Sequence, residues 1–232
     1  MDSIFECAGL TKFYKNFPAL NNVNIKIAPG RIVGLLGPNG SGKTTLIKMI
    51  NGLLTPTSGS LFVNGMKIGA KTKNIVSYLP DNNFLNPQFS TEEMINYFES
   101  FFEDFSRQTA EKMLCDLKID CFKKIKTLSK GTQEKVALIL VMSRKAKLYL
   151  LDEPIAGVDP ATRDYIMRTI LSAYDRSSSI IISTHLISDI EKILDDVIFI
   201  NNGNIMLSDS VENIKASGKE SVDEYFREVF RC

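Results

Sequence analysis

The segment Gly37 to Thr44, which reads Gly-Pro-Asn-Gly-Ser-Gly-Lys-Thr, constrains the fold more than any other part of the chain. An apolar run at residues 32–36 precedes it, and a helix-forming run at residues 45–50 follows it. Its glycines allow the backbone to wrap closely, so that successive N–H groups and the start of the helix can face phosphate oxygens. The segment therefore predicts a strand–loop–helix unit that holds phosphate groups.

The pattern is that of a P-loop, and it assigns roles to two residues. Lys43 would reach the β- and γ-phosphates of a nucleotide, and the hydroxyl of Thr44 would ligate Mg²⁺. The helix is expected to end near Gly52, because glycine readily adopts the left-handed conformation of a helix C-cap. The alternative is a glycine-rich turn that only joins a strand to a helix, and the full pattern in its expected context argues against it.

A pair of adjacent carboxylates follows a second apolar strand. Residues 148–151 are apolar and lead into Asp152 and Glu153. Neighbouring side chains of a strand point to opposite sides, but a bend at the carboxyl end lets both face a phosphate crevice. Asp152 would hold Mg²⁺, directly or through water, and Glu153 would accept a proton from the attacking water. The alternative is a helix N-cap or a solvated strand end; the lack of an Asn-Lys-x-Asp sequence argues against a GTPase.

Composition argues against several classes of function. The formal net charge is +1, and the charges are interspersed, so nothing indicates binding to nucleic acid or to an anionic membrane. Four cysteines without a CxxC pair and a single histidine make a zinc site unlikely on spacing grounds and suit a reducing cytoplasm. The longest apolar run, residues 136–142, is far below the roughly 20 residues that span a bilayer, so the chain is not expected to cross a membrane by itself.

The order of apolar segments predicts an α/β fold with a helical insert. Short apolar segments in the N-terminal part alternate with turns such as Asn64-Gly65, which indicates antiparallel strands. After Lys147, continuous apolar runs separated by helices indicate a mostly parallel sheet that is covered on both faces. Asn202-Gly203 is a second expected hairpin turn.

The insert, residues 86–145, is expected to be helical. Ser90 and Glu93 have the spacing of a capping box, and Ser106 could cap a second helix. We expect most of an apolar stripe at helical spacing to pack inside the insert: Met94, Ile95, Tyr97, Phe98, Phe101 and Phe102. The whole chain, 1–232, is expected to form one nucleotide-binding domain with these parts: a core at 1–85 and 146–220, the helical subdomain at 86–145, and a C-terminal helix at 221–232.

A third motif connects these features. Leu128 to Gln133 reads Leu-Ser-Lys-Gly-Thr-Gln and precedes a helical run. Together with the P-loop and the acidic pair, it resembles the signature of the ATP-binding-cassette (ABC) superfamily, which is usually written LSGGQ. The resemblance extends over essentially the whole chain. It implies an ATP-hydrolysing P-loop NTPase with a mostly parallel core sheet, an N-terminal antiparallel β-subdomain and an inserted α-helical subdomain.

The resemblance also implies roles for individual residues. Those that would bind ATP, with the Tyr14 ring stacked on adenine, are Tyr14, Gly37, Asn39, Gly40, Ser41, Gly42, Lys43, Thr44 and Thr45. Those that would be catalytic, with His185 sensing the γ-phosphate, are Lys43, Glu153 and His185. Those that would contact the ATP of a second subunit in a head-to-tail dimer are Ser129, Lys130 and Gly131. Asp159, in the loop 156–159, would couple the two sites.

The sequence departs from the usual pattern in two places, the signature and the segment at Asp81. The signature has Lys130 in place of a glycine and Thr132 ahead of Gln133. Similar Ser-Lys-Gly signatures occur in ATPases that resemble antibiotic and peptide exporters of the bacitracin and lantibiotic types, which indicates export. Asp81 stands where the family places a glutamine.

Asp81 is the sharper departure. We expect it to reach Mg²⁺ through a water and to form the metal site together with Thr44 and Asp152. An aspartate there keeps an oxygen ligand and adds negative charge, which favours metal binding. The alternative is that Asp81 only begins a surface loop.

The implied function is that of the ATP-driven subunit of a membrane transporter. ATP binding would close a dimer, homomeric or with a related subunit, and hydrolysis would reopen it. A separate membrane-spanning permease subunit, received near Phe84 and Leu85, would hold the chain at the cytoplasmic face of the cell membrane. The chief alternative is a soluble cassette ATPase acting on nucleic acid, ribosomes or protein assemblies, but the sequence has no second cassette and no basic patch. A module that binds ATP without hydrolysing it is disfavoured by Glu153 and His185.

Overall fold

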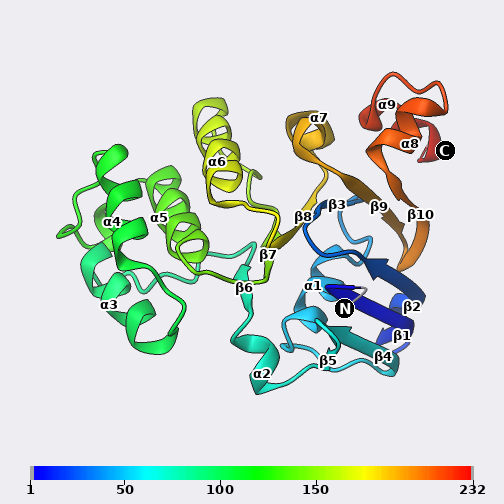
Figure 1. Ribbon diagram of the computed structural model, residues 1–232, viewed down its shortest axis with the longest axis horizontal. Helices are drawn as coiled ribbons and strands as arrows, with labels where there is room; N and C mark the ends of the chain where they lie inside the picture. Colours follow the sequence, from blue (N-terminus) through cyan, green and yellow to red (C-terminus); the bar gives the residue numbers. More distant parts are fainter. Residues whose placement is uncertain (1–2, 231–232) are drawn as a thin grey trace.

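The computed structural model describes residues 3–230 of the chain. Residues 1–2 of the expected core and residues 231–232 of the expected C-terminal helix lie outside this range. Figure 1 shows two β-sheets on one side of the molecule. On the other side lies a group of helices: α3 (Thr91–Phe101), α4 (Arg107–Asp116) and α5 (Lys130–Met142).

The larger sheet is the predicted core. Its strands are β3 (Ile32–Leu36), β6 (Val76–Leu79), β7 (Leu148–Asp152), β8 (Ser179–Thr184), β9 (Asp196–Asn201) and β10 (Asn204–Ser210). Their order across the sheet is β10-β9-β3-β8-β7-β6. The pairs from β9 to β6 are parallel, and β10 joins β9 as an antiparallel edge strand through the expected Asn202-Gly203 turn. The prediction of a mostly parallel sheet is confirmed.

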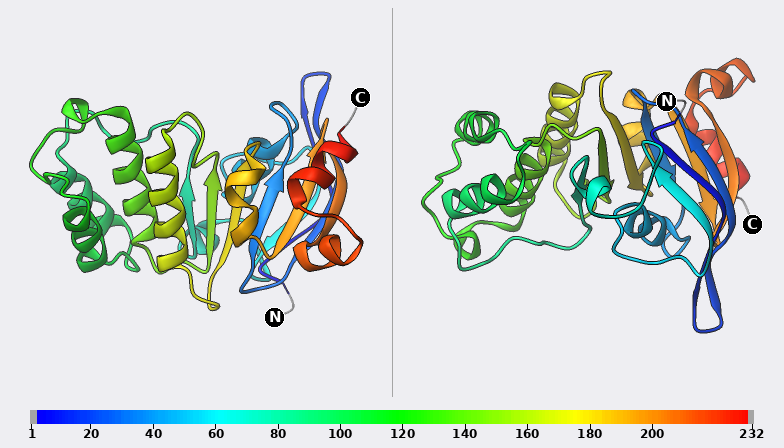
Figure 2. Two further views of the ribbon diagram at one scale, coloured as in Figure 1. Left: turned by 90° about the horizontal axis from the view of Figure 1, so that it is seen from above. Right: turned by 60° about the horizontal axis from the view of Figure 1, so that its bottom comes forward.

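The smaller sheet is antiparallel and comes mainly from the N-terminal part. Its strands are β1 (Phe5–Tyr14), β2 (Phe17–Ile27), β4 (Ser58–Val63) and β5 (Met66–Lys67), in the order β2-β1-β4-β5. Figure 2 shows the blue β1–β2 hairpin projecting beyond the body of the molecule. The expected turn at Asn64-Gly65 joins β4 to β5.

Two hydrophobic clusters cover the two faces of the larger sheet, and alternate residues of its strands point into each. Val33 and Leu35 of β3 belong to one cluster, whereas Ile32 and Leu36 belong to the other. The first cluster also contains the buried face of α1 (Lys43–Ile50) and the inner face of the smaller sheet. Helix α1 is therefore packed between the two sheets, which explains why β3 has no polar face. Gly52 has a φ of 71°, as its predicted place after the helix requires.

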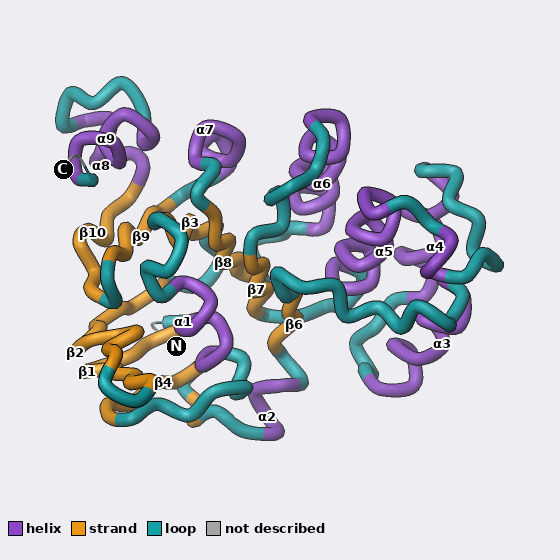
Figure 3. Tube along the Cα trace, turned by 180° about the vertical axis from the view of Figure 1, so that it is seen from behind, coloured by secondary structure: helices purple, strands orange, loops and turns teal. Residues whose placement is uncertain are grey.

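The helical group lies beyond the β6 edge of the larger sheet (Figure 3). Ser90 and Ser106 cap α3 and α4, and Ser90 forms the predicted capping box with Glu93. The expected apolar stripe is only partly internal. Met94, Ile95 and Phe98 are buried, but Tyr97 is 47% exposed and Phe101 is 65% exposed. These two rings lie on the outer face of α3 because the stripe is wider than the surface that α4 and α5 cover.

The remaining helices surround the larger sheet. They are α2 (Ala70–Lys73), α6 (Pro160–Ala173), α7 (Ile187–Ile190), α8 (Val211–Ala216) and α9 (Val222–Val229), with 3₁₀ turns at Ile125–Thr127 and Glu191–Ile193. Helix α9 is the expected C-terminal helix; Ser221 caps it, and Phe226 and Phe230 pack on Phe199 of β9. Within residues 3–230, no helix has both the length and the apolar character that crossing a bilayer requires.

One buried arginine joins the helical group to the larger sheet. Arg144 follows α5 and is 4% exposed. Its guanidinium donates to the two carboxylate oxygens of Asp104 at 2.9 and 3.1 Å, and to the carbonyls of Val76 at 2.7 Å and Asn74 at 3.1 Å. It also lies 3.9 Å from the ring centroid of Phe102. Because a buried charge must be paired and hydrogen-bonded, Arg144 fixes the end of the helical group to the start of β6.

We predict that Arg144→Met lowers the free energy of unfolding by about 2–4 kcal/mol, because Asp104 and the backbone carbonyls lose their donor. Urea unfolding followed by circular dichroism measures the change. Arg168→Met is the control, since Arg168 is exposed and donates to a carbonyl within its own helix. The control should alter stability by less than about 0.5 kcal/mol. An equally small loss in Arg144→Met would contradict the anchoring role.

Candidate active site

The P-loop joins β3 to α1 and requires glycine at two positions. A Cβ on Gly37 would lie 2.2 Å from the carbonyl oxygen of Ile200, and a Cβ on Gly42 would lie 2.5 Å from that of Ala19. Gly42 also has a φ of 111° and forms the N-cap of α1 without a side-chain hydrogen bond. The first N–H groups of α1 therefore have no capping side chain and are available to an anion.

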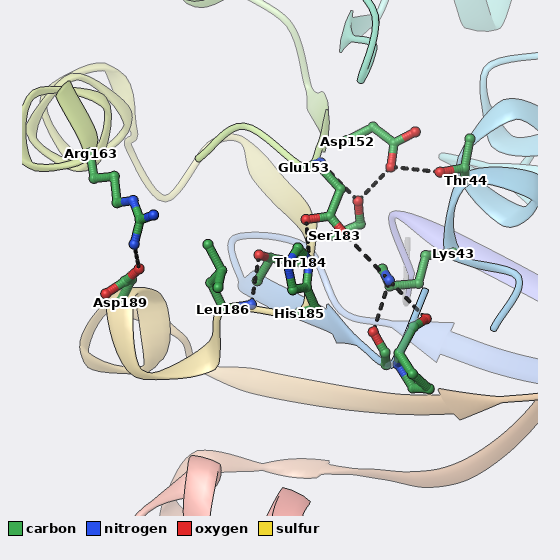
Figure 4. Close-up of polar contacts among 12 residues, drawn as sticks. Lys43, Thr44, Asp152, Glu153, Arg163, Ser183, Thr184, His185, Leu186 and Asp189 are labelled. Carbon is green, nitrogen blue, oxygen red and sulfur yellow. Dashed lines mark hydrogen bonds and ion pairs between the residues drawn. The ribbon is translucent and has the colours of Figure 1, made fainter. Parts of the chain in front are cut away.

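Lys43, at the first position of α1, is a nearly buried cation. It is 5% exposed. Its Nζ lies 2.8 Å from the carbonyl oxygen of Gly37, 3.2 Å from that of Pro38 and 3.3 Å from Oε1 of Glu153. The ammonium group is thus held at the mouth of the loop by these carbonyls and by Glu153, the residue that follows β7 (Figure 4).

Asp152 is the last residue of β7 and is 1% exposed. Its Oδ1 accepts hydrogen bonds from Ser183 Oγ at 2.5 Å and Thr44 Oγ1 at 3.1 Å, whereas its Oδ2 is buried without a partner. Burial raises the pKa of this carboxyl; the bonds from Ser183 and Thr44 oppose the rise, and the charges of Asp81 and Glu153 add to it. One oxygen of this buried carboxyl therefore remains without a hydrogen-bond partner.

Glu153 follows at a bend in the chain. Its φ is 50°, a left-handed conformation that is unusual for glutamate, and its backbone N–H donates to the carbonyl oxygen of Ser183 at 3.0 Å. This bend turns the Glu153 side chain towards Lys43, and its Oε2 lies 3.0 Å from Nδ1 of His185 (Figure 4). The carboxylate thus lies between the lysine and the histidine.

A cleft of about 320 Å³ opens in front of the P-loop. It is lined by residues 39–45 and by Tyr14, Phe17, Asp81 and Glu153. Gly37 does not line it, but its carbonyl holds Lys43. Tyr14 is 46% exposed and Phe17 is 60% exposed, and the two are paired across the β1–β2 hairpin. The cleft therefore combines an aromatic platform with a phosphate-sized loop.

Asp81 follows β6 and Pro80 and lies in this cleft. Its Oδ1 accepts a hydrogen bond from Asn82 Nδ2 at 3.1 Å. It lines this cleft together with Thr44, and it lines a neighbouring cleft of about 260 Å³ together with Asp152, whose pKa its charge raises. Asp81 is thus shared by two clefts, one lined by Thr44 and the other by Asp152.

The signature residues lie elsewhere. Ser129 caps α5 by accepting from the N–H of Thr132, and neither Ser129 nor Gly131 lines the P-loop cleft. The Lys130 side chain is 80% exposed and lines a second cleft of about 260 Å³ that also touches Asp152 and Glu153. Asp159 caps α6, and its Oδ2 would lie 3.9 Å from a Cβ on Gly131.

Oxygen atoms at the start of α1 and at the carboxyl end of β7 could hold a hard divalent cation. Thr44 offers a hydroxyl, and Asp152 offers a carboxylate oxygen that lacks a partner, which fits Mg²⁺. Among the described residues, no group of three or more His, Cys, Asp or Glu side chains is arranged to bind a metal alone. A cation here would therefore need further oxygens from water or from a bound ligand such as a phosphate.

Two residues of the site were not predicted from the sequence. Phe17 stands opposite Tyr14 in the hairpin, so the four-residue spacing Tyr-Lys-Asn-Phe was the available signal. Ser183 faces Asp152 only because β7 and β8 pair in parallel with these two residues in register. That register is a tertiary property, and no local pattern indicates it.

Comparisons with known proteins agree with this geometry. A model of the ABC transporter family matches residues 20–156. The ABC transporter ATP-binding protein YhaQ of Bacillus subtilis (strain 168), itself uncharacterized, is 29% identical over 219 residues, which cover 92% of this chain and 74% of that protein. Nod factor export ATP-binding protein I of Cupriavidus metallidurans is 29% identical over 211 residues, which cover 88% of this chain and 70% of that protein.

A solved structure of the ATP-binding subunit of an ABC transporter has the same fold. It superposes with a TM-score of 0.88 at 24% identity and covers 99% of this chain and 100% of its own. The prediction of an α/β P-loop fold with an antiparallel N-terminal sheet is confirmed by this likeness and by the two sheets described above.

Proposed function

Because this chain belongs to the ABC transporter family, we propose that it powers the export of a substrate through a separate membrane-spanning permease subunit. It is an ATP-binding P-loop NTPase that hydrolyses ATP. The observation that supports ATP hydrolysis as the power source is the position of Glu153, whose carboxylate lies between Lys43 and His185 at the mouth of the P-loop. That position suits a general base beside a bound γ-phosphate.

For ATP binding, we propose that the backbone N–H groups of residues 39–45 and the Nζ of Lys43 hold the phosphates. The adenine would stack on Tyr14, with Phe17 extending the platform, because both rings are exposed at the same cleft. His185 would orient Glu153 and contact the γ-phosphate, which is supported by its hydrogen bond to Oε2.

We predict that Glu153→Gln still binds ATP but hydrolyses it about 100-fold more slowly or worse, because the amide cannot accept the proton of the attacking water. Titration with a fluorescent ATP analogue measures binding, and phosphate release measures turnover. Glu103→Gln is the control, since Glu103 is exposed and lies outside the cleft. Wild-type turnover in Glu153→Gln would remove Glu153 from the catalytic role.

A magnesium ion would be held by the hydroxyl of Thr44 and the free Oδ2 of Asp152, with Asp81 reaching it through a water. Bound there, it would neutralise phosphate charge. The support is the unpartnered Asp152 oxygen and the negative charge that Asp81 adds beside it.

We predict that Asp81→Asn raises the Mg²⁺ concentration for half-maximal ATPase activity about three- to tenfold, because a charge beside the cation is lost. Activity at saturating ATP is measured over a Mg²⁺ series. Asp164→Asn, which removes an exposed charge on α6, should leave the midpoint unchanged. If Asp81→Asn behaves like this control, Asp81 is only a loop residue.

The signature and the coupling loop would act between two copies or between related subunits. Ser129 and Gly131 do not line their own P-loop cleft, so contact with ATP through these residues would require a second chain. Lys130 would add positive charge near that ATP, which its 80% exposed side chain permits. Asp159 would couple the sites; hydrogen bonds from Thr162 lower the pKa of its carboxyl and keep it charged beside Gly131.

The permease would hold the chain at the cytoplasmic face of the membrane, and it would dock between the helical group and the sheet. A groove of about 480 Å³ there is lined by Phe84, Phe98 and Phe102, which suits a short partner helix. We further propose that the chain belongs with the bacitracin- and lantibiotic-like exporters. The Ser-Lys-Gly signature supports this, as does the likeness to an ATP-binding protein of Nod factor export.

A further inference from the structure

Charge is unevenly distributed along the chain, although the net charge is only +1. Residues 7–80 contain nine lysines and arginines and no aspartate or glutamate, whereas residues 81–232 contain 25 acidic and 19 basic residues. The expectation that the charges are interspersed therefore does not hold for the first third of the chain. The smaller sheet, α1 and α2 are built from this segment, so positive charge is concentrated in that part of the molecule.

Four of these lysines gather around two neighbouring clefts. A cleft of about 550 Å³ between the end of α1, the β4–β5 hairpin and α2 is lined by Lys67 and Lys73. The groove of about 480 Å³ that also reaches α3 is lined by Lys48 and again by Lys73. Lys71 is exposed on α2, which lies at the lower edge of the molecule in Figure 1. Lys48, Lys67, Lys71 and Lys73 together make up a lysine face.

The lysine face lacks neutralising carboxylates. Within residues 3–230, the lysines that form ion pairs are Lys43, Lys130 and Lys219, and none of these belongs to the face. Of the residues that line its two clefts, Asp81 alone is acidic. The face therefore carries positive charge that a negatively charged partner would neutralise.

The surface between these lysines is apolar. Leu53 lines the groove and is 55% exposed. The stem of Lys73 lies over the end of α1, where its Cε would be 3.8 Å from a Cβ on Gly52. The apolar side chains that line the larger cleft are Met49, Leu54, Leu61, Phe62 and Ile68. Ammonium groups at the border of an apolar surface suit the boundary between lipid headgroups and acyl chains.

We propose that the lysine face binds anionic phospholipid headgroups at the cytoplasmic surface of the membrane. Lys48 and Lys73 also line the groove proposed for the permease, so docking there would turn the face towards the bilayer. This choice of partner rests on the proposed function. Cytoplasmic loops of membrane proteins carry an excess of lysine and arginine and do not complement the face, whereas anionic lipids attract each of its lysines.

Nucleic acid is the rival anion, and the lining of the larger cleft does not favour it. Nucleic-acid sites use arginine to read bases and exposed aromatic rings to stack on them. The residues that line this cleft include no arginine, and their one aromatic ring, that of Phe62, is half-buried. Lysines around an apolar surface therefore favour the lipid.

The double variant Lys67→Gln/Lys71→Gln tests the face, because these exposed lysines line neither the permease groove nor the P-loop cleft. The purified chain, without permease or nucleotide, is sedimented with vesicles of phosphatidylglycerol and phosphatidylcholine, and the partition coefficient is measured. We expect the wild-type chain to bind at low salt and to be released at high salt, because salt screens the attraction. The variant should bind about fivefold more weakly for each lysine, or about 25-fold in all.

Lys112→Gln/Lys215→Gln is the matched control. It removes two charges from exposed positions in α4 and α8, and neither residue lines the two clefts. The control should bind vesicles as the wild-type chain does. Both double variants should keep the wild-type thermal midpoint and the wild-type ATPase activity in solution, since all four substituted side chains are exposed.

Three results would overturn the inference. The first is a wild-type chain that does not bind the mixed vesicles, or that binds pure phosphatidylcholine equally well. The second is an equal loss in the control, which would show an effect of net charge alone. The third is a Lys67→Gln/Lys71→Gln variant that loses binding to a DNA duplex and keeps binding to vesicles. The vesicle assay contains neither permease nor ATP, so each of these results leaves the proposed transporter function standing.

Discussion

The buried ammonium group of Lys43 is the charge around which the rest of the structure is arranged. At 5% exposure it must be neutralised, and Glu153 and the carbonyls of Gly37 and Pro38 supply the negative atoms. This requires the end of β7 to lie beside the P-loop, a bend with positive φ at Glu153, and a loop tight enough to admit only glycine at position 37. Nucleotide phosphates would bind the same ammonium group, so Lys43 would contribute both to the fold and to ATP binding.

The packing keeps these atoms in place. Helix α1 lies between the two sheets, and β3 and β7 send alternate side chains into the two hydrophobic clusters. The parallel register sets Asp152 opposite Ser183, so the position of the oxygens proposed to bind Mg²⁺ depends on the pairing of β7 with β8. The signature, by contrast, lies at the start of α5 in the helical group, which Arg144 connects to β6. The nucleotide cleft and the signature therefore belong to different parts of the fold.

The sequence was enough to predict helix caps and turns, but it did not show which helices and strands contact one another. The caps at Ser90 and Ser106, the left-handed Gly52 and the Asn-Gly turns follow from single residues and short spacings, and all were predicted. The positions of Phe17 and Ser183, the anchoring by Arg144 and the exposure of Tyr97 and Phe101 depend on which elements meet. The roles of the P-loop, signature and coupling residues, the limits of the helical subdomain at 86–145, and the reach of Asp81 to a metal stay predictions, because each concerns a ligand, a partner or a motion.

Co-purification tests the central claim, a transporter ATPase with a separate membrane partner, most directly. The tagged protein is recovered from membranes of its own cells in a mild detergent, and the proteins that accompany it are identified by mass spectrometry. The account predicts a multi-spanning membrane protein in stoichiometric amount. Recovery only from the soluble fraction, with ribosomes, nucleic acid or no partner, would contradict it and leave an ATPase of the soluble cassette class.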